Sequence, residues 1–475
     1  MKVHMSTLSE DLTSFQIVSP ADGSILAERP YHTMEHAQER AHAAREAQRD
    51  WARRSIADRA RFCTALVDAL LADRERVAAE LTAQMGRPIS QAPGELRGFE
   101  ERARYMIQIA EESLAPVVPA PISGFTRSIQ RAPLGVVLDL PAWNFPYLTA
   151  VNALIPALMA GNAVLLKHAN QTALCADRLF DAAQAADLPQ GLFSTLDLTY
   201  AQTEQFVRSG SADFVCFTGS VFGGQAIERA AQESRRFIGV GLELGGKDPA
   251  YVRADADLGF AIENIVDGAM FNSGQSCCGI ERVYVHRDLY DTFVEGASAL
   301  IGQYRLGDPR DPETNLGPMV RVDAADKVRA QLEDAKRAGA SFMIDEECFP
   351  IAQLETPYVA PQLVTQVTHE MDLMREETFG PVMGVMPVDS DDEALRLMND
   401  SRYGLTASLW TQDEESAERL APQLEFGTVF MNRCDYLDPG LAWTGVKDTG
   451  RGCTLSRVGY EALTRPQSWH FRQSN

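Results

Sequence analysis

The chain has 475 residues, of which 45% are hydrophobic and 23% charged, and its formal net charge is −22. This length exceeds the roughly 250 to 300 residues at which a single hydrophobic core stops growing, so we expect at least two packed domains. The acidic balance argues against binding to nucleic acid or to an anionic membrane, because both partners require a basic surface.

Residues 1–15 contain no apolar core of a signal peptide, and no stretch approaches the roughly 18 apolar residues that a membrane helix needs. The eight cysteines form no CxxC pair and show no cysteine–histidine spacing of the zinc kind. Six of them are isolated, which is typical of buried thiols in a reducing compartment. We therefore expect a soluble, cytoplasmic protein without a bound metal.

Amphipathic helices are predicted over 34–52 and 57–85, where apolar residues recur at three- and four-residue spacing, and a third helix is predicted over 95–113. Short apolar runs separated by helical segments follow. These runs are 135–140, 162–168, 213–219 and 236–244. The alternation predicts βαβ units and a parallel sheet, which binds ligands beyond the carboxyl ends of its strands.

A second α/β pattern begins with a predicted helix over 257–270. Strand-like runs then recur at 281–287, 381–388 and 407–412. The sequence therefore predicts an α/β fold with two sheets.

Four motifs stand in order along the chain: PAWNFP (141–146), ELGGKDP (243–249), NSGQSCCG (272–279) and EETFGPV (376–382). In this combination and spacing the chain resembles the aldehyde dehydrogenase superfamily of NAD(P)-dependent enzymes over nearly its whole length. FTGS, GTVFMN and TGVKDTGRG add to the similarity. The resemblance implies a Rossmann-variant cofactor domain, an α/β catalytic domain and a small β oligomerisation hairpin.

The resemblance also implies domain boundaries. The cofactor-binding domain would comprise 1–117 and 136–242, and the catalytic domain 243–434. The oligomerisation segment would comprise 118–135 and 455–475, which implies a homodimer or homotetramer.

Adjacent cysteines such as Cys277 and Cys278 rarely bond each other, because their Cα atoms lie about 3.8 Å apart and disulfides need roughly 4.4 to 6.8 Å. An aldehyde releases hydride readily only after a nucleophile has made its carbon tetrahedral, and a thiolate suits that role. The resemblance assigns the nucleophile to Cys277, two positions after Gln275. Cys278 is then interpreted as a packing residue, and an inert buried thiol is the alternative for Cys277.

The resemblance assigns stabilisation of the oxyanion to the side chain of Asn144 and the backbone N–H of Cys277. Glu243 has the position of the general base, and the apolar run before it predicts a raised pKa. Asn144 as a turn residue and Glu243 as an ion-pair partner are the alternatives. The implied reaction oxidises an aldehyde to the acid through a thiohemiacetal and a thioester, and Glu243 favours hydrolysis over transfer to coenzyme A.

No GxGxxG follows the first predicted strands, so the ordinary dinucleotide fingerprint is absent. The resemblance implies NAD or NADP as cofactor, with the pyrophosphate near a helix N-terminus. Lys167 would contact the adenine ribose, and Glu377 the nicotinamide ribose. The implied cofactor residues are Trp143, Lys167, Asn170, Gly219, Ser220, Gly224, Glu377 and Phe379.

Two positions depart from the pattern of the superfamily. Ala153 stands where many members have lysine or arginine, so a proton relay through that side chain is absent and another route must serve. Asn170 stands where NAD-preferring members have glutamate, which favours use of both cofactors.

The substrate is a small-molecule aldehyde, and the sequence leaves aromatic, aliphatic and acid-semialdehyde classes open. Arg433 is a candidate contact for a substrate carboxylate. The implied pocket residues are Tyr147, Phe271, Leu437 and Trp443. A thiol esterase that uses Cys277 and Glu243 without a cofactor, and a non-catalytic relative, are the other functions considered.

Overall fold

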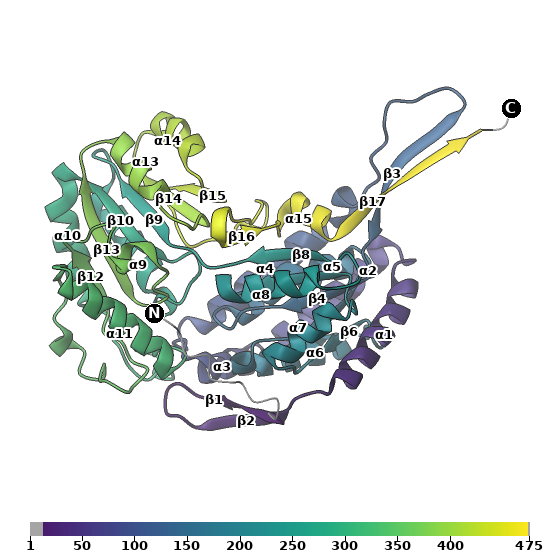
Figure 1. Ribbon diagram of the computed structural model, residues 1–475, viewed down its shortest axis with the longest axis horizontal. Helices are drawn as coiled ribbons and strands as arrows, with labels where there is room; N and C mark the ends of the chain where they lie inside the picture. Colours follow the sequence, from purple (N-terminus) through teal and green to yellow (C-terminus); the bar gives the residue numbers. More distant parts are fainter. Residues whose placement is uncertain (1–12, 474–475) are drawn as a thin grey trace.

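The computed structural model describes residues 13–473 and contains two large β-sheets covered by helices (Figure 1). Residues 1–12, part of the segment in which no signal peptide is expected, lie outside this range. The first sheet has six strands in the order β16-β8-β7-β4-β5-β6, all parallel except β16 against β8. Its strands are β4 (Val136–Leu140), β5 (Ala163–Leu166), β6 (Phe193–Thr195), β7 (Phe214–Thr218), β8 (Gly239–Glu243) and β16 (Gly450–Arg451).

Helices cover the first sheet because β4 and β5 are buried along their whole length and need apolar partners on both faces. The indole N–H of Trp51 donates to the backbone oxygen of Leu158 (2.8 Å), which ties two of these helices together. The helices are α1 (Met34–Trp51), α2 (Ile56–Ala72), α3 (Arg74–Met85), α4 (Ala92–Ser113), α5 (Pro146–Met159), α6 (Ala173–Ala185), α7 (Tyr200–Arg208) and α8 (Val221–Gln232). In residues 13–473 no helix combines the length and apolar composition that crossing a membrane requires.

The single helix predicted over 57–85 is wrong, because the structure breaks it at Asp73 into α2 and α3. Asp73 has φ −108° and ψ 27°, outside the helical range, and it flanks both helices. Aspartate is a weak helix former, and Arg76 forms an ion pair with it from the next turn (3.5 Å). Apolar spacing continues across the break, so periodicity alone gives no sign of it.

The second sheet has seven strands in the order β11-β12-β13-β10-β9-β14-β15, parallel except for β11. The runs predicted at 281–287, 381–388 and 407–412 are confirmed as β10, β13 and β14, and the helix predicted at 257–270 as α9. The strands are β9 (Asp248–Val252), β10 (Ile280–His286), β11 (Ser341–Phe342), β12 (Gln362–Thr365), β13 (Val382–Val388), β14 (Thr406–Trp410) and β15 (Thr428–Met431). The main helices are α9 (Leu258–Met270), α10 (Arg287–Ile301), α11 (Val322–Arg337), α13 (Asp391–Asn399) and α14 (Glu414–Leu420).

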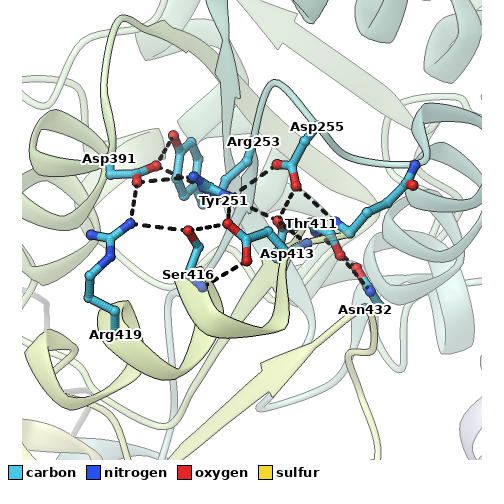
Figure 2. Close-up of polar contacts among 10 residues, drawn as sticks. Tyr251, Arg253, Asp255, Asp391, Thr411, Asp413, Ser416, Arg419 and Asn432 are labelled. Atoms are coloured by element: carbon cyan, nitrogen blue, oxygen red, sulfur yellow. Dashed lines mark hydrogen bonds and ion pairs between the residues drawn. The ribbon is translucent and has the colours of Figure 1, made fainter.

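A charged network fastens α13 and α14 to the carboxyl ends of β9 and β14 (Figure 2). Asp391 accepts hydrogen bonds from Arg253 (2.9 Å) and Tyr251 (2.9 Å), and Arg419 of α14 donates to it from the other side (3.2 Å). Asp255 accepts from the hydroxyl of Thr411 (2.7 Å). The network lies at the strand ends opposite to the active site, so its contribution is to the framework.

A two-stranded ribbon extends away from the body of the molecule (Figure 1). Strand β3 (Phe125–Pro133) pairs antiparallel with β17 (Thr464–Arg472), although more than 300 residues separate them. The preceding helix α15 (Ser456–Ala462) packs on α4, where the hydroxyl of Tyr460 donates to Met106 (2.6 Å). The segment 455–475 is therefore divided between a packed helix and the ribbon, except for residues 474–475, which are outside the described range.

Candidate active site

The site lies where the carboxyl ends of the first sheet meet the amino ends of the second. Asn144 follows β4, Lys167 follows β5, and Glu243 is the last residue of β8. Cys277 precedes β10 and Glu377 precedes β13. The parallel order of both sheets brings these side chains together from distant parts of the chain, as expected for an open α/β sheet.

The turn before Cys277 has an unusual backbone. Asn272, Ser273 and Gly274 have φ values of 54°, 57° and 67°, all in the left-handed region. A Cβ atom on Gly274 would lie 2.1 Å from the backbone oxygen of Gly380, so only glycine fits there. Three consecutive left-handed residues cost free energy and persist only where the surroundings impose them, which is common at functional sites.

The two cysteines have different surroundings. Cys277 is partly buried, whereas Cys278 is buried and donates its S–H to Asp435 (3.0 Å), which also accepts from the hydroxyl of Ser276 (3.0 Å). A hydrogen bond with Cys277, together with burial and the charge of Asp435, raises the pKa of Cys278 well above its ordinary value. Burial raises the pKa of Asp435 to about 6. Cys278 is therefore a neutral thiol that Asp435 holds in place.

The amide of Asn144 is fixed next to the turn that carries the nucleophile. Its Nδ2 donates to the backbone oxygen of Gln275 (3.1 Å), two residues before Cys277. Asn272 donates to the same oxygen (3.1 Å) and to the backbone oxygen of Asn144 (3.2 Å). The amide donor and the thiol are thus held on one hydrogen-bonded unit, as stabilisation of an oxyanion requires.

A buried ion pair between Arg87 and Glu95, which was not predicted from the sequence, supports this unit. Arg87 donates through Nε to Asn272 (3.1 Å) and through its terminal nitrogens to Glu95 and to the backbone oxygen of Asn144. Glu95 in turn accepts from the backbone N–H of Tyr147 (2.7 Å) in the first turn of α5. Removing one member of such a pair leaves an uncompensated buried charge, so both residues position the site.

Glu243 lies in a polar niche rather than in direct contact with the thiol. Its carboxylate accepts hydrogen bonds from the hydroxyls of Thr454 (2.5 Å) and Thr218 (3.4 Å). Burial raises the pKa of Glu243, as its place after an apolar run predicts, and the threonine bonds and the charge of Arg102 oppose that rise. A carboxylate with a raised pKa is suited to accept a proton near neutral pH.

Arg102 is a buried cation next to these groups. Its side chain is 7% exposed and donates to Asn152 (3.2 Å) and to the backbone oxygen of Leu148 (3.2 Å). Burial lowers its pKa, and the charges of Glu243 and Cys277 act in the opposite direction. In residues 13–473 no carboxylate lies within ion-pair distance of its guanidinium. A buried charge that has only neutral acceptors can bind an anionic ligand group.

Lys167 and Asn170 lie together at the end of β5. The Nζ of Lys167 donates to Oδ1 of Asn170 (3.4 Å) and lies 5.6 Å from the ring centre of Tyr200. The amide nitrogen of Asn170 donates to the hydroxyl of Tyr31 (2.7 Å). Burial lowers the pKa of Lys167 to about 8, which leaves it mostly charged at neutral pH.

The candidate phosphate residues lie at the start of α8. The hydroxyl of Ser220 caps this helix by accepting from the backbone N–H of Gly223 (3.1 Å). The backbone N–H of Gly219 donates to the backbone oxygen of Glu243 (3.0 Å). Gly224 packs α8 against Leu244, because a Cβ there would lie 2.6 Å from a methyl group of that leucine. The exposed helix start offers free N–H groups to an anion.

The candidate nicotinamide residues precede β13. The backbone N–H of Gly246 donates to Glu377 (3.1 Å), and burial, with a contribution from Glu281, raises the pKa of Glu377 to about 8. Glu281 fixes the same loop by accepting from the backbone N–H of Phe379 (2.8 Å). The rings of Phe379 and Trp143 meet edge to face with centres 5.6 Å apart.

The pocket candidates differ in burial. Leu437 and Phe271 are partly buried, the latter at the end of α9, and Trp443 is buried with 5% exposure. Tyr147 is fully buried, with its ring perpendicular to that of Phe99 (6.4 Å). The structure therefore places Tyr147 in the core behind the site.

The fold and the site define an α/β enzyme with a cysteine, a side-chain amide and a buried carboxyl on facing sheet edges. The chain belongs to the aldehyde dehydrogenase family, whose family model matches residues 7–469. This confirms the predicted family and fold class.

Relatives agree over nearly the whole chain. An NADP-dependent succinate-semialdehyde dehydrogenase of Mycobacterium tuberculosis is 36% identical over 415 residues, which cover 86% of this chain and 89% of the relative. An aldehyde dehydrogenase of Paenarthrobacter nicotinovorans is 35% identical over 446 residues, or 93% and 96% of the two chains. The crystal structure of an NAD-dependent aldehyde dehydrogenase from Sinorhizobium meliloti has a TM-score of 0.92 at 30% identity and covers 97% of this chain and 92% of its own.

Proposed function

We propose that the protein oxidises an aldehyde to the carboxylic acid through a thiohemiacetal and a thioester on Cys277. The single observation that supports this most is the hydrogen bond from Nδ2 of Asn144 to the backbone oxygen of Gln275 (3.1 Å), which holds the amide next to the turn that carries Cys277. When the thiolate attacks the carbonyl carbon, negative charge develops on the carbonyl oxygen. The amide of Asn144 and the backbone N–H of Cys277 are the donors for that oxygen.

We propose NAD or NADP as the cofactor, because the residues at the site suit a dinucleotide. Lys167 is a buried cation without a carboxylate in ion-pair distance in residues 13–473, and the start of α8 at Ser220 is exposed. Glu377 is the candidate acceptor for ribose hydroxyls, and Phe379 would lie beside the nicotinamide. When bound, the cofactor accepts the hydride. The relatives named above include both an NADP-dependent and an NAD-dependent enzyme.

Glu243 then acts as the general base of hydrolysis. It takes a proton from water as the water oxygen bonds to the thioester carbon, and the carbon–sulfur bond breaks with the electron pair returning to Cys277. The raised pKa of Glu243 supports this role. A water-activating base at this place favours hydrolysis over transfer to coenzyme A.

An acid semialdehyde is the substrate class that we favour. The Mycobacterium tuberculosis relative is named for a substrate of this class. The buried guanidinium of Arg102 is the better candidate for the second carboxylate, because Arg433 is exposed and lies over the ring of Tyr436 (3.6 Å).

We also propose a homodimer or homotetramer that is assembled through the β3–β17 ribbon. An isolated two-stranded ribbon is marginally stable in water, and this one exposes Trp469 and Phe471. A second copy would cover both.

A panel of aldehydes with each cofactor, followed by the absorbance of reduced nicotinamide, tests the proposed function. We expect cofactor-dependent turnover that is fastest with acid semialdehydes. Ester hydrolysis without reduction of either cofactor by any aldehyde would instead favour the thiol esterase.

A further inference from the structure

A small cavity lies behind Glu243, between the first sheet and α5. The volume open to the centre of a water-sized sphere is about 30 Å³. One water molecule needs roughly 10 to 15 Å³ by this measure, so the cavity can hold water. Glu243 and Thr218 line it on the sheet side, and Asn152 and Ala153 line it on the side of α5. The small side chain of Ala153 leaves this space open, at the position where many family members have a lysine or arginine.

Asp139 lines the same cavity from the middle of the sheet. Asp139 pairs with Cys216 of β7, and Thr218 of the same strand pairs with Glu243 of β8. Because side chains alternate along a strand, Asp139 and Glu243 project from one face of the sheet. Strand β7 lies between β4 and β8, so the strands of the two residues are two interstrand spacings, or about 10 Å, apart. The cavity therefore separates the two carboxyls, which are not in direct contact.

The carboxyl of Asp139 lacks a structural explanation. Its side chain is 2% exposed, and its Oδ2 has no hydrogen-bond partner in residues 13–473. Burying a polar atom without a partner is unfavourable, so such atoms are rare and often mark a water site or a catalytic role. Burial raises the pKa of Asp139 well above its ordinary value, and the charge of Glu243 raises it further.

No nearby charge neutralises both carboxyls. The other titratable groups that face the cavity or its lining are Arg102, Cys216, Arg451 and Cys453. Burial raises the pKa of both thiols, and that of Cys453 to about 11, so both are neutral. Arg451 is paired with Glu228 (2.5 Å) at the exposed end of the cavity. Burial raises the pKa of both carboxyls, and the charge of Glu243 raises that of Asp139 further, so ionisation of Glu243 disfavours ionisation of Asp139.

We propose that Asp139 and Glu243, bridged by water in this cavity, form a proton-sharing pair that removes the proton of the hydrolytic water during deacylation. The proposal rests on the proposed function. Glu243 accepts a proton from the attacking water, and the pair then holds one proton too many. The excess proton passes through the cavity water and leaves for solvent at the end lined by Arg451, which restores the singly ionised pair. Asp139 is thus a positioning residue that acts through Glu243.

Asp139→Asn tests the pair, because asparagine keeps the shape and cannot ionise. We expect the first rapid release of reduced cofactor to be unchanged and the steady-state rate to fall at least about tenfold. Ester hydrolysis without cofactor is measured under conditions in which deacylation limits the rate. Its pH profile should show two inflections in the wild type and one in Asp139→Asn. Thermal stability should not fall, because the substitution removes a poorly solvated carboxyl.

Cys216→Ala is the matched control, since it alters the same cavity and keeps both carboxyls. It should retain the two inflections and near wild-type turnover. Wild-type turnover together with an unchanged pH profile in Asp139→Asn would overturn the proposal. An equal defect in Cys216→Ala, or loss of the first release of reduced cofactor in Asp139→Asn, would overturn it as well. A wild-type enzyme that reduces neither cofactor would instead refute the proposed function itself.

Discussion

Asn170→Glu should make the enzyme discriminate against NADP. The Oδ1 atom of Asn170 lies 3.4 Å from the Nζ of Lys167, so a carboxylate at this position would lie where a ribose 2′-phosphate meets the lysine. Two negative charges about 4 Å apart repel by about 1 kcal/mol in water and about 4 kcal/mol at an effective dielectric of 20. Lys167 offsets part of this repulsion. We therefore expect kcat/KM with NADP to fall at least about tenfold, while the value with NAD changes little.

The assay compares kcat/KM for both cofactors at one saturating aldehyde concentration, in wild type, Asn170→Glu and Asn170→Gln. Asn170→Gln lengthens the side chain by the same amount without adding charge, so it controls for lost contact with Tyr31. The kcat/KM values of the wild type for the two cofactors should lie within about a hundredfold of each other, which corresponds to roughly 2.7 kcal/mol of transition-state discrimination. A wild type that rejects NADP, or an equal ratio in the Glu and Gln variants, would show that residue 170 does not face the ribose.

Four further substitutions test other parts of the site. Cys277→Ala should abolish aldehyde oxidation and Cys278→Ala should retain it, and the reverse result would show that the nucleophile is misassigned. Arg102→Met should raise KM for an acid semialdehyde at least about tenfold and leave KM for an uncharged aldehyde of equal length unchanged; equal effects on both would exclude a carboxylate contact. Arg87→Lys should lower both the melting temperature and kcat, because lysine cannot bond Glu95 and Asn272 together; unchanged values in both measurements would remove Arg87 from the support of the site.

The parallel sheets and the family were predictable because their signals are local. The apolar runs that became β4, β5, β7 and β8 are continuous, and β4 and β5 are buried along their whole length. The motifs around Asn144, Glu243 and Cys277 are contiguous in sequence. Strands β6, β9, β12 and β15 were missed because they are short and carry no alternation that separates them from loops.

The supporting charges could not be predicted. Arg87 lies in the connection between α3 and α4, and Glu95 lies in the first turn of α4. Charged residues at such places are normally exposed, and only the fold shows that both are buried. Asp139 interrupts an apolar strand, and this local signal marks it as an unusual buried residue. Its proximity to Glu243 depends on the register between strands, which the sequence does not specify. Tyr147, an aromatic residue next to a motif, is fully buried, and its burial likewise could not be predicted from the sequence.

Pre-steady-state kinetics of Glu243→Gln test whether a thioester on Cys277 is hydrolysed with Glu243 as the base. We expect a burst of reduced cofactor close to one equivalent per active site, followed by steady turnover slowed at least about a hundredfold, because forming the thioester does not need the base and hydrolysing it does. Loss of the burst itself would show that Glu243 acts before the thioester forms, and unchanged steady turnover would show that Glu243 is not the base.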